Sequence, residues 1–198
     1  MKKIVTLALA IAGATALPAG AHEIGVLFDQ QGGRSQDSST TSVDMVKPRG
    51  KAIRGAYTLL DLAVTEVAIT GTWHDKADDD IVSAPPSGYT RGSFSYVALG
   101  AQVDWKLLLN VNAGLEMRRE KVTLDRSGGG SEDQSFTRPW ARLGLGWSLP
   151  LPVVSPFVRL EAGYALTHDS LPANASASDF AKAIAPRYQV GVYGGVRF

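Results

Sequence analysis

The chain has 198 residues with 20 basic and 19 acidic side chains, so its formal net charge is +1 and no strong field favours nucleic acid as a partner. It contains no cysteine, which excludes disulfide bonds as a source of stability. Hydrophobic residues make up 44% of the chain, but after residue 21 no apolar run approaches the roughly 18 residues that a membrane-spanning helix requires.

The first 21 residues have the pattern of a secretory signal peptide. A basic start, Met1–Lys3, precedes an apolar segment from Ile4 to Leu17, and Ala19-Gly20-Ala21 fits the small-x-small cleavage rule. We therefore expect residues 1–21 to be removed and residues 22–198 to form one exported domain. Removing two of the 20 basic residues would leave the domain with a net charge near −1.

Strand-like runs follow one another along this domain, with apolar residues at alternate positions. The eight predicted strands are residues 23–31, 52–62, 66–73, 92–104, 107–122, 135–149, 157–168 and 187–198. In the second run both the odd-numbered and the even-numbered positions (the two parities of a strand) carry apolar residues, so the sequence does not show which set faces outward.

The connections alternate between long polar stretches and short links. The long ones are residues 32–50, 74–91, 125–134 and 169–186; the short ones lie near 63–65, 105–106 and 150–156. Short turns on one side and long loops on the other are typical of membrane barrels, and closure leaves no strand edge unpaired in lipid. The sequence therefore predicts an all-β, eight-stranded antiparallel up-and-down transmembrane β-barrel.

The two parities of the strands predict different surroundings. The apolar parity would face lipid, with Trp73, Trp105, Trp147, Tyr164 and Tyr188 near strand ends, where aromatic girdles form. Trp140 falls with the inward parity of its strand, and the adjacent Pro139 predicts a bulge there.

Charged side chains concentrate on the inward parity. Eight strands enclose an interior that side chains fill, so paired charges would plug the lumen rather than line a proton or ion path. The predicted lumen network consists of Glu116, Arg118, Arg138, Arg142, Arg159, Glu161 and Arg197.

The best catalytic candidates are His168 and Ser170, which flank Asp169 at the end of the seventh run. A histidine and a serine oriented by an acid can hydrolyse an ester. The pair is similar to the His-x-Ser element of PagL-type lipid A deacylases, which are also eight-stranded barrels. However, Leu171 stands where that family has Asn, and no Glu follows Glu161. We favour a polar strand-to-loop junction without catalysis.

A second candidate site is acidic. Asp78, Asp79 and Asp80 follow His74 and Asp75 and are weak candidates for a divalent-cation site, since hard cations take clustered carboxylates. The glycine and terminal Glu of an EF-hand loop are missing, so we favour a solvated acidic loop close to the cations that bridge lipopolysaccharide phosphates. We expect no cofactor and no resident metal.

The closing strand carries the clearest family resemblance. Tyr193-Gly-Gly-Val-Arg-Phe198 places Val196 and Phe198 on the apolar face, and the terminal Phe is similar to the signal that the barrel assembly machinery reads. With the signal peptide and the loop rhythm, this ending resembles the small eight-stranded outer-membrane barrels: the OmpX/Ail group, the opacity and NspA-like proteins, and the OmpA transmembrane domain.

That resemblance implies a protein of the bacterial outer membrane without chemistry of its own. Its partners would be outer-membrane lipid and lipopolysaccharide, the barrel assembly machinery, and an extracellular protein or host ligand bound through the loops, with Leu171, Phe180 and Ile184 as the expected hydrophobic contacts. Two alternatives stay open. One is an OmpW-like conduit for small hydrophobic molecules, which requires an apolar lumen pocket, and the other is a PagL-like deacylase.

Overall fold

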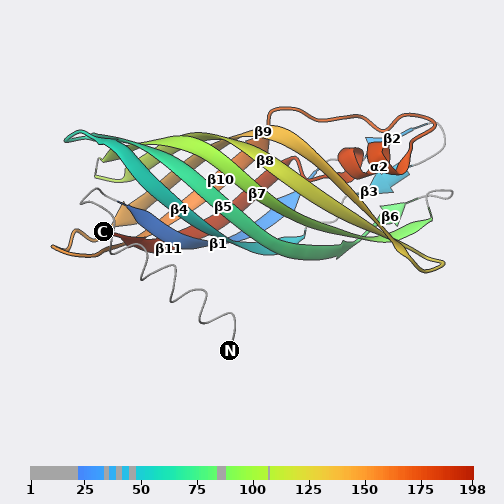
Figure 1. The fold of residues 1–198 in the computed structure, drawn as a ribbon, viewed down its shortest axis with the longest axis horizontal. Coiled ribbons are helices and arrows are strands. Elements are labelled where there is room, and N and C mark those ends of the chain that lie inside the picture. The colour runs from blue at the N-terminus through green and yellow to red at the C-terminus, as the bar shows by residue number, and fades with distance from the viewer. Residues whose placement is uncertain (1–21, 34–35, 39–41, 45–47, 84–87, 107) are drawn as a thin grey trace.

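The computed structural model describes residues 22–33, 36–38, 42–44, 48–83, 88–106 and 108–198. The predicted signal peptide, residues 1–21, lies outside the described residues. Figure 1 shows a long barrel of tilted strands, with the C-terminus at one end and the helix α2 at the other.

Eight strands close the barrel, and each pairs with two antiparallel neighbours. They are β1 (Glu23–Gly32), β4 (Arg49–Asp61), β5 (Thr65–Asp80), β7 (Tyr89–Lys106), β8 (Asn110–Arg126), β9 (Ser131–Ser148), β10 (Ser155–Ala165) and β11 (Tyr188–Arg197). The predicted fold class, an eight-stranded antiparallel barrel, is confirmed.

The first and last barrel strands close the ring. Ten consecutive pairs join β1 to β11, from Glu23 opposite Arg197 to Gly32 opposite Tyr188. Beyond the strand, His22 and Phe198 exchange backbone hydrogen bonds of 2.8 and 2.9 Å. The connections after β4, β7 and β9 lie at this end of the barrel, which we call the turn end, and those after β1, β5, β8 and β10 lie at the opposite loop end.

The strands are longer toward the loop end than the sequence predicts. The prediction of a loop over residues 74–91 is wrong at both ends, because β5 continues to Asp80 and β7 begins at Tyr89. The loop predicted over 125–134 is a tight hairpin between Arg126 and Ser131. Both errors have one cause: these strand ends are polar because they extend past the lipid-facing band, and polar strands read as loops.

Two register details also differ from expectation. In β4 the pairing with β5 shifts between Thr58 and Leu60, so a bulge carries the outward positions from one parity to the other. This bulge explains why both parities of the strand carry apolar residues in the sequence. No bulge occurs at Pro139, which pairs in regular register opposite Met117.

The last long connection contains a helix that the sequence did not predict as such. Helix α2 (Ala177–Ile184) begins at Ser176, whose side chain accepts a hydrogen bond from the Asp179 backbone amide. The Asp179 carboxylate in turn accepts from Ser176, and these hydrogen bonds lower the pKa of Asp179. Short strands β2 (Gln36–Asp37), β3 (Ser42–Asp44) and β6 (Val82–Ser83) form a small sheet at the same end (Figure 1).

Helix α2 covers a hydrophobic core at the loop end. Its Phe180 and Ile184 are buried together with Leu171, so the expectation that these three contact an external partner is wrong. They pack instead on the inner face of the strand ends that extend past the lipid-facing band. The strand residues of this core are Tyr89, Phe94, Tyr96, Val122 and Leu124.

The outside of the barrel carries a continuous apolar surface. Outward side chains such as Leu99, Leu115, Leu143 and Leu160 are 61–70% exposed, although a water-soluble protein would bury them. Lipid is the medium in which such a closed barrel is stable, and the surface suits the bacterial outer membrane. The described residues include no helix that is long and apolar enough to cross a membrane.

Candidate functional site: the lumen and the loop end

Six of the seven predicted lumen residues are buried inside the barrel, and the seventh, Arg197, lies at its turn end with 12% of its side chain exposed. Each of the seven takes part in at least one ion pair. Alternation explains this placement, because the neighbours of each inward residue along its strand face outward. Seven further lumen residues that are charged or carry an imidazole stand outside that predicted network: Glu23, Asp29, Arg54, Glu66, His74, Asp104 and Glu120.

At the turn end, Arg159 bridges two carboxylates. Its guanidinium donates to both oxygens of Glu23 at 3.1 and 2.6 Å, and Nη2 lies 3.3 Å from Asp104 Oδ1. Arg197 Nη2 adds a second contact to Glu23 at 3.1 Å. Glu66 accepts from Thr58 Oγ1 at 2.5 Å and lies 3.3 Å from the Lys106 ammonium group. These contacts join side chains from six strands, β1, β4, β5, β7, β10 and β11, at the turn end of the lumen.

The middle of the lumen holds two carboxylates between three arginines. Arg54 Nη1 donates to Glu161 Oε2 at 2.5 Å, and Arg142 Nη1 lies 3.6 Å from the same oxygen. Arg142 Nε lies 2.8 Å from Glu116 Oε2, while Arg118 Nε donates to Glu116 Oε1 at 2.5 Å. Because each of these two carboxylates lies next to at least one guanidinium, it has an oppositely charged partner although it is buried away from water.

Nearer the loop end, the charged side chains of the lumen contact aromatic rings and side-chain amides as well as carboxylates. The Arg118 guanidinium lies between the rings of Tyr96 and Trp140, 4.2 and 3.8 Å from their centroids. Its Nη2 donates to Gln189 Oε1 at 2.5 Å. The Trp140 indole N–H donates to Glu120 at 2.7 Å, which explains why a tryptophan occupies an inward position.

His74 belongs to this part of the lumen and not to an exposed acidic loop. Its ring stacks on Tyr96, with centroids 4.7 Å apart, and its Nε2 lies 3.2 Å from Asp29 Oδ1. Gln31 Nε2 donates to Asp29 Oδ2 at 2.9 Å, and Gln189 donates to the same carboxylate. The bulge after His74 separates it from the acidic residues that follow.

Those acidic residues have separate partners. Asp78 Oδ1 lies 3.4 Å from the Lys76 ammonium, Asp80 pairs with Arg91 at 3.6 Å, and the Asp79 carboxylate accepts from the Asp80 backbone amide at 2.8 Å. Within the described ranges, no group of three or more histidine, aspartate or glutamate side chains is arranged to hold a metal ion.

The catalytic candidates His168 and Ser170 lie just past β10 and are exposed to solvent. In the part of the chain that the structure describes, no hydrogen bond or ion pair joins them to each other or to Asp169. An activated nucleophile needs a base within hydrogen-bond reach, and this segment does not supply that geometry. The idea of catalysis here stays a prediction from sequence only.

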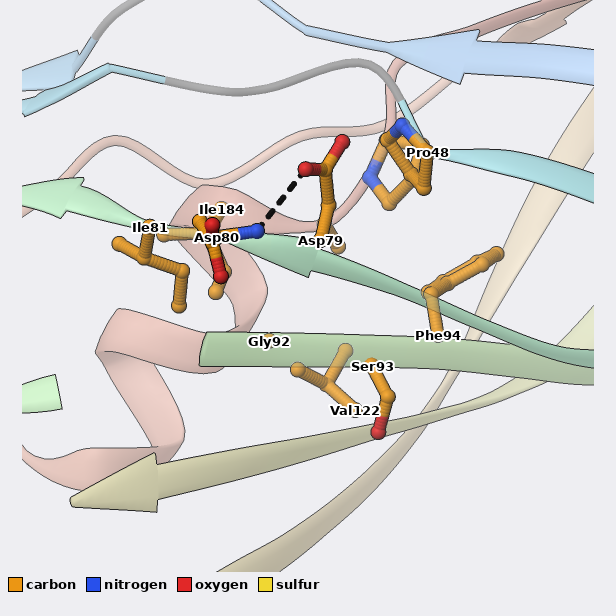
Figure 2. Close-up of a pocket in the computed structure, with 11 residues that line it drawn as sticks. Pro48, Asp79, Asp80, Ile81, Gly92, Ser93, Phe94, Val122 and Ile184 are labelled. Atoms are coloured by element: carbon orange, nitrogen blue, oxygen red, sulfur yellow. Dashed lines mark hydrogen bonds between the residues drawn. The ribbon is translucent and has the colours of Figure 1, made fainter. Parts of the chain in front are cut away.

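An apolar pocket exists at the loop end, between α2 and the ends of β5, β7 and β8. Figure 2 shows Ile81, Phe94, Val122 and Ile184 around it, with Asp79 and Asp80 at its rim. Its volume of about 40 Å³ admits little more than a water-sized group. The pocket lies at the loop end, and the lumen between it and the turn end is filled with charged side chains. It therefore does not provide the apolar passage that a conduit for hydrophobic molecules requires.

Comparison with known proteins finds similarity in structure and not in sequence. No protein-family model and no curated protein sequence matches the chain. Ail, the attachment invasion locus protein of Yersinia pestis, aligns with 16% identity and a TM-score of 0.49 over 91% of this chain and 100% of that one. Neisserial surface protein A (NspA) aligns with 14% identity and a TM-score of 0.48 over 90% and 98%.

Ail has also been determined as an outer membrane protein in a phospholipid bilayer nanodisc, and that structure aligns with a TM-score of 0.47. The fold class rests on the strand pairing of this chain itself, which closes eight antiparallel strands into a barrel. At identities this low the likeness concerns the fold, and the residues of this chain must carry any conclusion about function.

Proposed function

We propose that the chain is a non-enzymatic outer-membrane surface protein, with a lumen closed by paired charges and a loop end that binds an extracellular partner. The observation that carries the proposal is the balance of charge inside the barrel. Six arginines face seven carboxylates there, with Lys106 reaching Glu66 from the turn end, and every one of these groups has a partner. A network without a surplus of either sign favours rigidity over transport.

The polar rim of the loop end supports a binding role for the loops. The core under α2 holds this end together, while the hairpin tip at Ser127–Gly130 and the segment Thr167–Ser170 are exposed. Gly129 and Gly130 have φ values of 88° and 93°, which only glycine adopts without strain, so the tip is a tight turn. Among the described residues, these segments offer exposed contact surface to a partner.

Two measurements test the proposal. Purified barrel in a planar lipid bilayer should give no steady ion conductance at neutral pH, and stable channel openings would contradict the closed lumen. Cells displaying the protein should bind extracellular-matrix or host-cell surfaces. Replacing Thr167–Ser170 by a Gly-Ser segment of equal length should reduce that binding. Binding equal to that of cells without the protein would contradict the role of the loops.

A matched control keeps the second test specific. Leu149–Val154 connects β9 to β10 at the turn end and is also exposed, so replacing four of its residues perturbs an exposed connection on the opposite side of the barrel. The turn-end variant should bind as the unmodified protein does. Heat-modifiable migration on a gel would verify that both variants form the barrel.

A further inference from the structure

The three connections at the turn end of the barrel are apolar throughout. They are residues 62–64, 107–109 and 149–154, and every residue in them is alanine, valine, leucine or proline. The connections at the loop end have a different composition, and residues 127–130, at the tip of the hairpin between β8 and β9, are serine and glycine. We call the three turn-end connections the apolar turns. The short turns of outer-membrane barrels face the periplasm, where side chains of this kind would meet water.

The described side chains of the apolar turns are not buried by the protein itself. Leu108 is 95% exposed and Val153 is 79% exposed. The charged residues beside the turns are occupied with one another, because Asp61 pairs with Lys106, and the Lys106 ammonium group lies 3.3 Å from Glu66 at the mouth of the lumen. A contiguous exposed apolar surface of this kind marks contact with a partner or with a membrane.

The apolar turns continue the lipid-facing surface of the barrel. On β8 the outward positions from Met117 to Val111 are all apolar and lead to Leu109 in the turn. On β9 the outward Trp147 is followed at the next outward position by Leu149, which already belongs to the turn. Lipid is the medium on one side of this boundary, and the chemistry of the surface does not change across it. Continuity therefore favours lipid as the medium on the other side.

The height of the lipid-facing band supports the same conclusion. The band runs from Val111 to Met117 on β8 and from Val97 to Trp105 on β7, before polar outward residues follow toward the loop end. At about 3.3 Å per residue and a strand tilt of about 40°, these stretches span about 15 and 20 Å of the membrane normal. Outer-membrane barrels present an apolar band of about 25 Å. The apolar turns extend the band at the end where the strands alone leave it too short.

We propose that the apolar turns insert into the phospholipid leaflet at the turn end of the barrel, where Leu108 and Val153 contact lipid instead of periplasmic water. The turn end is then an embedded rim, and the charges of Asp61 and Lys106 at the lumen mouth lie close to the headgroups. This inference goes beyond the proposed function, because it assigns a lipid partner to the turn end whatever the loop end binds.

The test uses the absence of natural cysteines, which allows one fluorescent label to be attached at a chosen position. Leu108→Cys and Val153→Cys place an environment-sensitive label on two of the apolar turns, where the exposed side chains lose little packing. Ser127→Cys, at the exposed tip of the β8–β9 hairpin, is the matched control at the loop end. Each barrel is reconstituted in long-chain phosphatidylcholine nanodiscs, which leave both ends open to solvent. Heat-modifiable migration verifies that each variant forms the barrel.

The labels at positions 108 and 153 should be quenched by lipids that carry a nitroxide on the acyl chain. They should also be about fivefold less accessible to iodide than the label at position 127, because a hydrated anion does not enter the apolar part of a leaflet. In short-chain lipids, whose hydrocarbon thickness approaches that of the strand band, iodide should reach positions 108 and 153 more readily, while access to position 127 stays unchanged.

Two results would overturn the proposal. Iodide access at positions 108 and 153 equal to that at position 127 in long-chain lipids would place the turns in water. Shielding from iodide without quenching by the nitroxide lipid would mean that a second copy of the chain, and not lipid, covers the turns. Failure of the unmodified barrel to insert in the nanodisc would instead overturn the membrane placement on which the proposed function also rests.

Discussion

Replacing Arg159 by methionine should destabilise the barrel far more than replacing an exposed lysine with the same ion-pair distance. Arg159 lies 2.6 Å from Glu23 with both side chains at most 2% exposed, and Lys121 lies 2.7 Å from Asp133 with both more than 50% exposed. The two N–O distances are similar, but Arg159 is buried and also contacts Asp104, so the comparison sets the loss of a buried ion-pair cluster against the loss of a solvated pair.

The expected magnitudes follow from that difference. Arg159→Met leaves Glu23 and Asp104 in the lumen with Arg197 as their shared guanidinium partner, and breaking such a buried pair costs about 3–5 kcal/mol. Lys121→Met breaks a solvated pair that contributes about 0–1 kcal/mol. With a denaturant slope of about 2 kcal/mol per molar urea, the Arg159 variant should unfold roughly 1.5–2.5 M earlier and the Lys121 variant within about 0.5 M of the parent.

The assay is urea unfolding of the barrel in lipid vesicles, followed by tryptophan fluorescence and by heat-modifiable migration. Adding Glu23→Gln to Arg159→Met removes one of the two carboxylates that then share Arg197, and it should recover part of the lost midpoint. Equal shifts for the buried and exposed variants would refute the reasoning, because they would mean that water screens the lumen as it screens the surface. A double variant less stable than Arg159→Met alone would refute the explanation by surplus negative charge.

Three other predictions concern separate parts of the molecule. Gly50→Ala would place a methyl group against the His74 ring and should cost about 1–3 kcal/mol in the same urea assay, whereas Gly71→Ala, with no described atom within 4 Å of the new carbon, should cost little. The lowered pKa of Asp179 stabilises the cap of α2 above the ordinary aspartate pKa of about 4, and this contribution is lost as pH falls through the folded-state value. The protection of the helix amides, measured as exchange relative to the intrinsic rate at each pH, should therefore fall on acidification, and Asp179→Asn should abolish that loss of protection. Expression of the protein should leave the acyl-chain profile of lipid A unchanged with His168 intact or replaced by alanine, and mass spectrometry showing a chain lost only with the intact residue would establish a hydrolase.

Local alternation in the sequence determined most of the barrel. Side chains of a strand alternate between its faces whatever the strand pairs with, so Leu143 and Arg142 could be assigned to opposite faces from their spacing. The number of strands followed in the same way, whereas the loops predicted over 74–91 and 125–134 are shortened by strands that continue into them. The seven predicted lumen residues came from the same parity, although their partners did not.

Only the tertiary structure decided which charges meet and what covers the loop end. Arg54 and Glu161 are 107 residues apart, and their 2.5 Å contact exists because closure brings β4 and β10 to opposite walls of one narrow lumen. The bulge in β4 depends on its neighbour's register, so the sequence of that strand left the side of Arg54 open. Helix α2 reads as a polar loop because only one of its faces is apolar, and the core that buries that face comes from strands far away in the sequence. Alternation is a property of each strand alone, whereas pairing and capping require contacts between distant segments, and those contacts exist only once the barrel has closed.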